Sequence, residues 1–296
     1  MSCAIFLSMK EKNPWLLMDH DGTLTDSDLE AREYREIVLD YMSSELGVPR
    51  EEMKVLLERA DAEIESKKEI YGWKIGDIFV APATSDHYVK NTVAGSMALE
   101  MLAKESTSMK QFTDPAEVEK FVGKVFRASS PKLGVFYKWE AERCLRELNK
   151  TGRFMIITNS DPKVVLNKMT KLLGDDALDF SIVGNAKKYL PDPTWTGVVP
   201  EGMYKGFPGF PERGVNLQRK IYYMTLLDIT SGDLTRAKMA GDIAELDLLM
   251  LDYLGAETAL VLSATTPAWE NNYYYRGEGK RFTSGNLNKI TDWFLR

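Results

Sequence analysis

Short apolar runs alternate with helical patterns through the second half of this 296-residue chain, and that alternation limits the possible folds more than any other feature. Phe154-Met-Ile-Ile157 predicts a strand, and Ser160-Asp-Pro162 directly after it predicts the start of a helix. Further strands are predicted at 180–183, 237–240 and 258–262. Strands that alternate with helices form βαβ units with right-handed crossovers. We therefore predict an α/β fold with a doubly wound, mostly parallel sheet.

A further apolar run, Trp15-Leu-Leu-Met18, ends directly in the polar sequence Asp19-His-Asp-Gly-Thr23. An uninterrupted run of this kind is typical of a strand that is buried on both faces, as parallel strands are. Polar residues directly after such a strand lie at its carboxyl end, where open α/β sheets bind their ligands. Functional side chains are therefore expected at this point.

Between residues 26 and 130 the apolar side chains repeat at helical spacing, and no strand of comparable strength is evident. Asp114-Pro-Ala-Glu117 is an example of a helix start, because it combines an N-cap carboxylate, a proline in the first turn and a capping-box glutamate. We predict a mostly helical cap domain at 26–130, inserted into a catalytic core formed by 1–25 and 131–296.

Polar side chains cluster at or just beyond the ends of the predicted strands. The clusters are Asp19-x-Asp21-Gly-Thr23, Thr158-Asn159-Ser160, Lys187-Lys188, and Gly241-Asp242 with Asp247. Because the carboxyl ends of parallel strands lie on one edge of a sheet, these clusters can converge. Together they offer a carboxylate nucleophile, oxygen ligands for Mg²⁺, and donors and a cation for a phosphate group. The pattern favours phosphoryl transfer.

In order and spacing, these four segments resemble the sequence motifs of the haloacid-dehalogenase-like (HAD) hydrolases. The resemblance covers about the first 25 residues and nearly everything after residue 130. It implies a Rossmann-like core and, because a carboxylate stands at Asp21 where dehalogenating members lack one, the phosphatase branch with a helical cap after the first motif.

By this resemblance Asp19 would be the nucleophile that forms an aspartyl-phosphate, and it would also bind Mg²⁺. Asp21 would protonate the leaving group, activate the hydrolytic water and offer its backbone carbonyl to the metal. Asp242 would be the third protein ligand of the metal. Asp247 would be a supporting acid nearby.

The resemblance also implies a phosphate site made by Thr158 and the backbone amide of Asn159. Lys188 would hold the nucleophile and the phosphate together. The family lysine is commonly followed by proline, whereas here Lys187-Lys188 precedes Tyr189, so Lys187 stays an alternative to Lys188.

The predicted function is Mg²⁺-dependent hydrolysis of a phosphate monoester of a small metabolite. The alternatives are a phosphotransferase or phosphomutase, or a 5′-nucleotidase, acting through the same site. A catalytically silent binding protein of the same fold is a rival from a different class, although none of the required carboxylates is missing. No pattern in the sequence identifies the substrate or the oligomeric state.

Composition excludes several partners. A formal net charge of −6 argues against nucleic acid, and no apolar stretch approaches the ~18 residues of a membrane span.

Two cysteines, Cys3 and Cys144, form no disulfide framework, and the first ten residues lack the basic start of a signal peptide, so a cytoplasmic location is expected.

Two further segments carry specific expectations. His20 is expected to point away from its neighbouring aspartates if the chain is extended there, which favours packing or solvent contact over catalysis. The segment 190–214 is rich in proline, glycine and aromatic residues, and an ordered flap is predicted for it.

Overall fold

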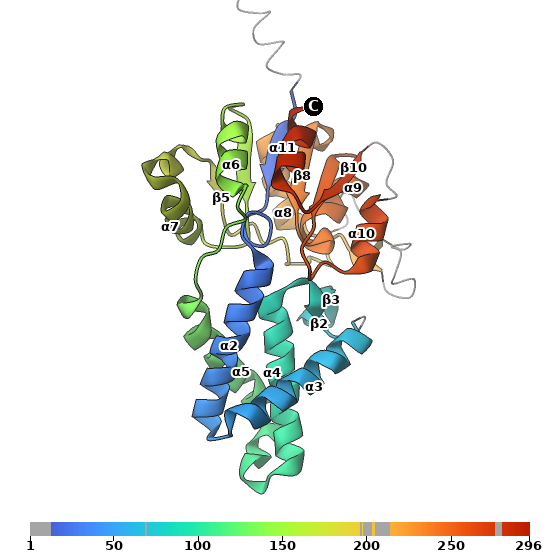
Figure 1. Ribbon diagram of the computed structural model, residues 1–296. Helices are drawn as coiled ribbons and strands as arrows, with labels where there is room; N and C mark the ends of the chain where they lie inside the picture. The colour runs from blue at the N-terminus through green and yellow to red at the C-terminus, as the bar shows by residue number, and fades with distance from the viewer. Residues whose placement is uncertain (1–12, 69, 196, 198–202, 205–213, 276–279) are drawn as a thin grey trace, which may run out of the picture. The chain divides into compact units, whose positions relative to one another are not determined.

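The structure is a computed structural model that describes residues 13–68, 70–195, 197, 203–204, 214–275 and 280–296 (Figure 1). The chain divides into two compact units: residues 1–26 with 137–296, which we call the core unit, and residues 27–136, which we call the inserted unit. Each unit is described by itself below.

A six-stranded parallel sheet forms the centre of the core unit. Its strands, in the order β10-β9-β8-β1-β4-β5 across the sheet, are β10 (Arg281–Ser284), β9 (Glu257–Val261), β8 (Ala237–Gly241), β1 (Trp15–Met18), β4 (Phe154–Ile157) and β5 (Ile182–Val183). The predicted doubly wound α/β fold is confirmed. The edge strand β10 was not predicted.

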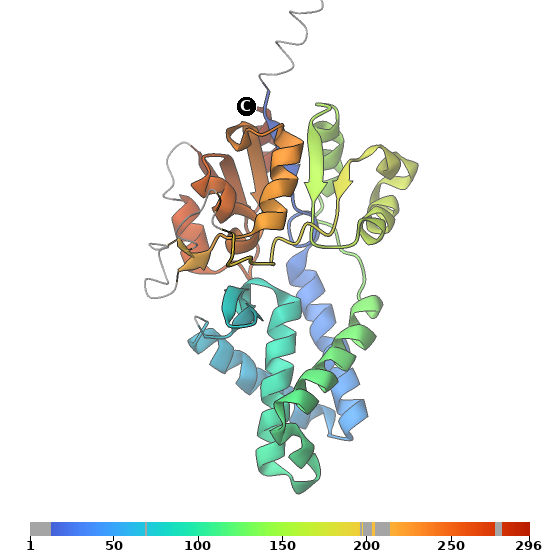
Figure 2. The same cartoon turned by 180° about the vertical axis from the view of Figure 1, so that it is seen from behind.

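Helices cover both faces of this sheet (Figures 1 and 2). The helices are α6 (Ala141–Asn149), α7 (Pro162–Leu173), α8 (Lys220–Thr230), α9 (Leu249–Tyr253), α10 (Ala268–Tyr275) and α11 (Leu287–Leu295). Buried side chains of α6, α7 and α11 share one hydrophobic cluster with the sheet, and those of α8, α9 and α10 share another. A short antiparallel pair, β6 (Met203–Tyr204) and β7 (Val215–Asn216), lies outside the main sheet.

The strand β1 contributes to both hydrophobic clusters because successive side chains of a strand point to opposite faces. Leu16 and Met18 belong to the cluster with α6, and Leu17 belongs to the cluster with α8. Full burial of such a side chain stabilises the fold by roughly 1.5–3 kcal/mol. These contacts fix β1 in the middle of the sheet, where its carboxyl end is flanked by two neighbours.

The strand register brings three carboxyl ends side by side. Met18, the last residue of β1, pairs with Ile156 of β4 and with Ala240 of β8. The backbone N–H of Asp19 donates to Ala240 O at 2.9 Å, so the pairing continues one residue beyond β1. Residues that follow these strands therefore start from the same edge of the sheet.

In its described residues the inserted unit has four main helices and one hairpin. They are α2 (Ser27–Leu46), α3 (Arg50–Ser66), β2 (Gly72–Ile75), β3 (Ile78–Pro82), α4 (His87–Glu105) and α5 (Pro115–Ser129). Asp114 caps α5 as its sequence predicts, with Asp114 Oδ1 accepting from the N–H of Ala116 at 2.9 Å.

The hairpin adds two short strands to the insertion, where the sequence showed no strand of comparable strength. β2 and β3 pair antiparallel across a two-residue turn at Gly76 and Asp77. Gly76 has a φ of 58°, the left-handed value that a type II′ hairpin turn requires at its first central position. The Gly-Asp pair is the sequence signal for this turn.

Two other expectations meet the limits of the described residues. Most of the predicted flap at 190–214 lies outside them, as do the first ten residues. Within the described part of the chain, no helix combines the length and the apolar character that crossing a membrane demands.

Candidate active site

A tight loop follows β1 and carries the first motif. The N–H groups of Leu24 and Thr25 donate to His20 O at 2.9 and 3.3 Å, so the chain turns back directly after the strand. Gly22 has a φ of 77°, and a Cβ placed there would lie 2.0 Å from Asp242 Oδ2. Only glycine permits both this conformation and this close approach.

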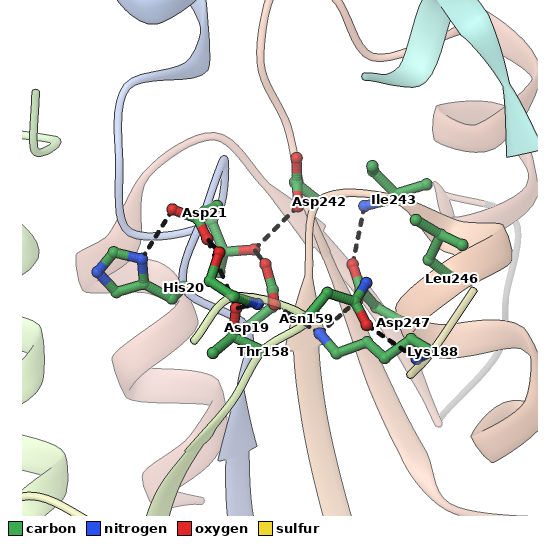
Figure 3. Close-up of polar contacts among 12 residues, drawn as sticks. Asp19, His20, Asp21, Thr158, Asn159, Lys188, Asp242, Ile243, Leu246 and Asp247 are labelled. Atoms are coloured by element: carbon green, nitrogen blue, oxygen red, sulfur yellow. Dashed lines mark hydrogen bonds and ion pairs between the residues drawn. The ribbon is translucent and has the colours of Figure 1, made fainter. Parts of the chain in front are cut away.

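Lys188 joins two carboxylates in the interior of the core unit (Figure 3). Its Nζ donates to Asp19 Oδ1 at 2.5 Å and to Asp247 Oδ1 at 2.7 Å, and all three side chains are buried. Burial disfavours the charge of Lys188, but the attraction of Asp19 and Asp247 outweighs burial and raises the pKa of the ammonium. Lys188 is therefore charged at the point where two motifs meet.

The neighbouring lysine takes a different direction. Lys187 has a φ of 51°, and its Nζ lies 3.3 Å from the hydroxyl of Tyr189. The backbone N–H of Lys188 donates to Asn159 Oδ1 at 2.8 Å, which ties this loop to the second motif. The left-handed residue redirects the chain so that Lys188, and not Lys187, reaches Asp19.

Three carboxylates form the group that could hold a metal ion among the described residues. One oxygen from each of Asp19, Asp242 and Asp247 lies within 4.8 Å of the others. Asp242 accepts from the hydroxyl of Thr23 at 3.2 Å. Asp247 Oδ2 accepts from the N–H of Ile243 at 3.1 Å, so both carboxylates are held in place.

The charges of this group suit a divalent cation. Burial, opposed by Lys188 and reinforced by Asp247 and Asp21, raises the pKa of Asp19 to about 7. Burial, Asp247 and Asp19 likewise hold the pKa of Asp242 well above its usual range. When all three carboxylates are ionised, they and the one ammonium carry two net negative charges, which a divalent cation with oxygen ligands would offset.

Asp21 lies apart from this carboxylate group, and its side chain has other partners. It accepts from Ser160 Oγ at 2.6 Å and from Lys168 Nζ at 2.6 Å. Burial opposes its charge, but the attraction of His20 and Lys168 outweighs burial and lowers the pKa of Asp21 well below its usual value. The free protein therefore holds Asp21 as a carboxylate.

The expectation that His20 points away from its neighbouring aspartates is wrong for Asp21. His20 Nδ1 donates to Asp21 Oδ1 at 3.1 Å, and His20 Nε2 lies 3.0 Å from the hydroxyl of Tyr137. The extended geometry assumed in that expectation ends at His20, because the chain turns there. The expectation of packing is correct, since the ring is fully buried and meets Tyr137 edge to face.

The second motif forms a compact turn before α7. Thr158 is buried, and its Oγ1 accepts from the N–H of Ser160 at 3.1 Å and lies 3.5 Å from Asp21 Oδ2. Asp161 caps α7 by accepting from the N–H of Lys163 at 2.8 Å. Because Asp161 supplies the cap, the side chain of Ser160 remains directed at Asp21.

The structure adds residues that sequence reasoning missed. Arg219 is fully buried and donates through Nη1 to Lys188 O at 2.7 Å and to Leu246 O at 3.3 Å, which links the third and fourth motifs. The hydroxyl of Tyr222 donates to Asp247 O at 3.0 Å. No sequence signal separates these residues from an ordinary helix start, because their partners are backbone atoms far away along the chain.

Solved structures of similar architecture cover almost the whole chain. A 2-haloacid dehalogenase from Pseudomonas syringae pv. Tomato DC3000 is 15% identical, with 96% of this chain and 98% of that chain covered and a TM-score of 0.47. YfnB from Bacillus subtilis, described as a HAD-hydrolase bound to magnesium, is 14% identical over 96% of this chain and 100% of that chain, with a TM-score of 0.49.

A HAD phosphatase from Thermococcus onnurineus is 14% identical over 95% of this chain and 97% of that chain, with a TM-score of 0.45. No family model and no curated protein sequence matches the chain. At these identities and TM-scores the likeness assigns neither an activity nor a substrate.

Proposed function

We propose that the chain is a Mg²⁺-dependent phosphohydrolase that cleaves phosphate monoesters of small metabolites through an aspartyl-phosphate on Asp19. The observation that carries this proposal is the buried contact of Lys188 with Asp19 and Asp247 beside Asp242. It combines a nucleophile, a cation for the phosphate and carboxylates that could hold a divalent metal, which together meet the requirements of phosphoryl transfer.

In the first step a carboxylate oxygen of Asp19 attacks phosphorus and the bond to the leaving oxygen breaks. Asp21 gives its proton to that leaving oxygen. Asp21 is ionised in the free protein, so it must take up a proton before this step. A monoanionic phosphate ester carries one, since the second phosphate pKa is about 6.

In the second step water attacks the phosphorus of the aspartyl-phosphate and passes a proton to Asp21. The bond between phosphorus and Asp19 breaks, which returns the carboxylate and releases inorganic phosphate. A lowered pKa makes Asp21 a weak base. It also keeps Asp21 in the unprotonated form that must accept this proton.

The remaining groups bind and orient. Thr158 and the backbone N–H of Asn159 would bind the phosphate oxygens, and Lys188 would offset their charge. Asp19, Asp242 and the backbone carbonyl of Asp21 would hold Mg²⁺, with Asp247 in support. When bound, the ion would neutralise charge that develops on the phosphate oxygens.

Asp21 favours phosphate ester hydrolysis over carbon–halogen cleavage. A halide ion is a very weak base and leaves without a proton, so dehalogenation has no use for a carboxylic acid at this position. An alkoxide leaving group does need one. The carboxylate group that suits a divalent cation supports the same choice, because a phosphate ester brings negative charge that a cation offsets.

The first test is hydrolysis of a generic aryl phosphate and of a panel of phosphorylated metabolites, with and without Mg²⁺. We expect phosphate release that stops in excess chelator and returns when Mg²⁺ is restored, and no halide release from 2-haloacids. Full activity in excess chelator, or halide release in place of phosphate release, would contradict the proposal.

We further propose that the inserted unit selects the leaving group. Contacts remote from the reacting centre can speed a reaction as well as tighten binding. Substitutions of exposed residues in this unit should then change the kcat/KM ranking within the same panel and leave small aryl phosphates nearly unaffected. Variants that slow every ester equally would instead indicate a role in stability.

Lys188→Met should lower kcat by about 10²–10³-fold, the range reported for losing one donor to a developing charge. Lys187→Met is the matched control and should change kcat little, because Lys187 contacts Tyr189 and not Asp19. Steady-state kinetics with a melting curve for each variant gives the comparison. The reverse ranking would show that Lys187 serves the phosphate.

A further inference from the structure

Both oxygens of the Asp21 carboxylate are bound by side chains of the core unit. Oδ2 accepts from Ser160 Oγ at 2.6 Å, and Oδ1 accepts from Lys168 Nζ at 2.6 Å and from His20 Nδ1 at 3.1 Å. Donors on different oxygens fix the plane of a carboxylate as well as its position. In Figure 3 the Asp21 carboxylate lies beside His20.

Lys168 reaches Asp21 from a rigid support. It lies in α7, which buries Val165, Met169 and Leu173 against the sheet. The side chain of Lys168 is 20% exposed and that of Asp21 is 29% exposed, so the pair lies at the margin of the site. The helix α7 fixes the position of the Lys168 ammonium, and the shorter Asp21 side chain is oriented by its contact with it.

An ion pair on a protein surface usually contributes little to stability. This pair differs because its carboxylate belongs to the reaction site, where the negative charges of Asp21 and Asp19 repel each other. The ammonium of Lys168 contacts Asp21, whereas that of Lys188 contacts Asp19 and Asp247. Without Lys168, Oδ1 would keep only the longer contact with His20 at 3.1 Å, so the carboxylate would be held less firmly in this orientation.

We propose that Lys168 is a positioning residue that fixes the orientation of the Asp21 carboxylate for proton transfer to the leaving group. The inference rests on the proposed phosphohydrolase function. It assigns Lys168 no contact with the phosphate and no part in metal binding. Its effect on phospho-enzyme formation should therefore appear only where a proton from Asp21 limits that step.

The test compares Lys168→Met and Lys168→Arg, with Lys171→Met as the matched control. Lys171 is an exposed lysine in the last turn of the same helix. Each variant is assayed with phosphate monoesters whose leaving groups range from alcohols to nitrophenol, and the Mg²⁺ activation constant and melting temperature are measured alongside.

We expect Lys168→Met to lower kcat/KM for alkyl phosphates by roughly 10- to 100-fold, the scale of a misplaced reacting group. Nitrophenyl phosphate needs little protonation, and its kcat/KM, which reports phospho-enzyme formation, should fall much less. The Mg²⁺ constant and the melting temperature should stay near wild type. Lys168→Arg should recover most of the rate, and Lys168→Met should add little in an Asp21→Asn background.

An equal loss of kcat/KM for every leaving group, a shifted Mg²⁺ constant, or full activity of Lys168→Met would overturn the inference. A crystal structure of Lys168→Met gives a readout independent of activity, since an unmoved Asp21 carboxylate would also overturn it. The proposed function fails separately, if Asp19→Asn retains activity. A dead Asp19→Asn with a uniform loss in Lys168→Met would remove this inference alone.

Discussion

Asp19→Asn is expected to reduce phosphate ester hydrolysis by on the order of 10⁴-fold or more, the scale on which removing a covalent nucleophile acts. The amide matches the shape of the carboxylate but cannot form the acyl phosphate. The change also removes one of the three carboxylates that could hold the metal. Lys188 keeps its contact with Asp247, so the fold should persist.

Steady-state kinetics measures this loss, and a melting curve shows whether the variant is folded. Asp175→Asn is a suitable control, since it makes the same chemical change at an exposed position of the core unit. It should leave kcat unchanged. An Asp19→Asn variant that is folded and still turns over substrate would exclude Asp19 as the nucleophile.

Asp21→Asn should lower kcat by about 10²–10⁴-fold, the contribution of a general acid or base. Its effect on metal binding should be small, because the side chain of Asp21 lies outside the group formed by Asp19, Asp242 and Asp247. The asparagine oxygen can still accept from Ser160 or Lys168, so the loop should keep its shape. The backbone carbonyl is unaffected by the substitution.

Kinetics combined with calorimetric titration of Mg²⁺ separates these two effects. For Asp21→Asn we expect a large loss of turnover with nearly unchanged Mg²⁺ affinity. For Asp242→Asn we expect mainly a loss of Mg²⁺ affinity. Equal losses of affinity and rate in Asp21→Asn would mean that its side chain serves mainly as a metal ligand.

Buried strands were the most predictable part of the fold. Trp15–Met18 and Phe154–Ile157 are uninterrupted apolar runs, and the structure has them as adjacent strands. The edge strand Arg281–Ser284 escaped prediction because its sequence, Arg-Phe-Thr-Ser, holds one large apolar residue. An edge strand pairs with one neighbour, so fewer of its residues need to be apolar.

The site was predictable as a set of motifs but not in its local geometry. Lys188 could not be chosen over Lys187 from sequence, because the left-handed backbone at Lys187 decides which side chain reaches Asp19. The predicted direction of the His20 side chain was wrong for a similar reason, since the chain turns after β1 and is not extended there. Lys168 carries no signal of its own among the other lysines of α7.

The most direct measurement is to quench the enzyme with acid during turnover of an aryl phosphate and locate the phosphoryl group by peptide mass spectrometry. A good leaving group favours formation of the phospho-enzyme over its hydrolysis, so the intermediate should accumulate. We predict a phosphoryl group on the Asp19 side chain that disappears once the substrate is exhausted. It should be absent from Asp19→Asn. A phosphoryl group on any other residue, or turnover by Asp19→Asn, would contradict the account.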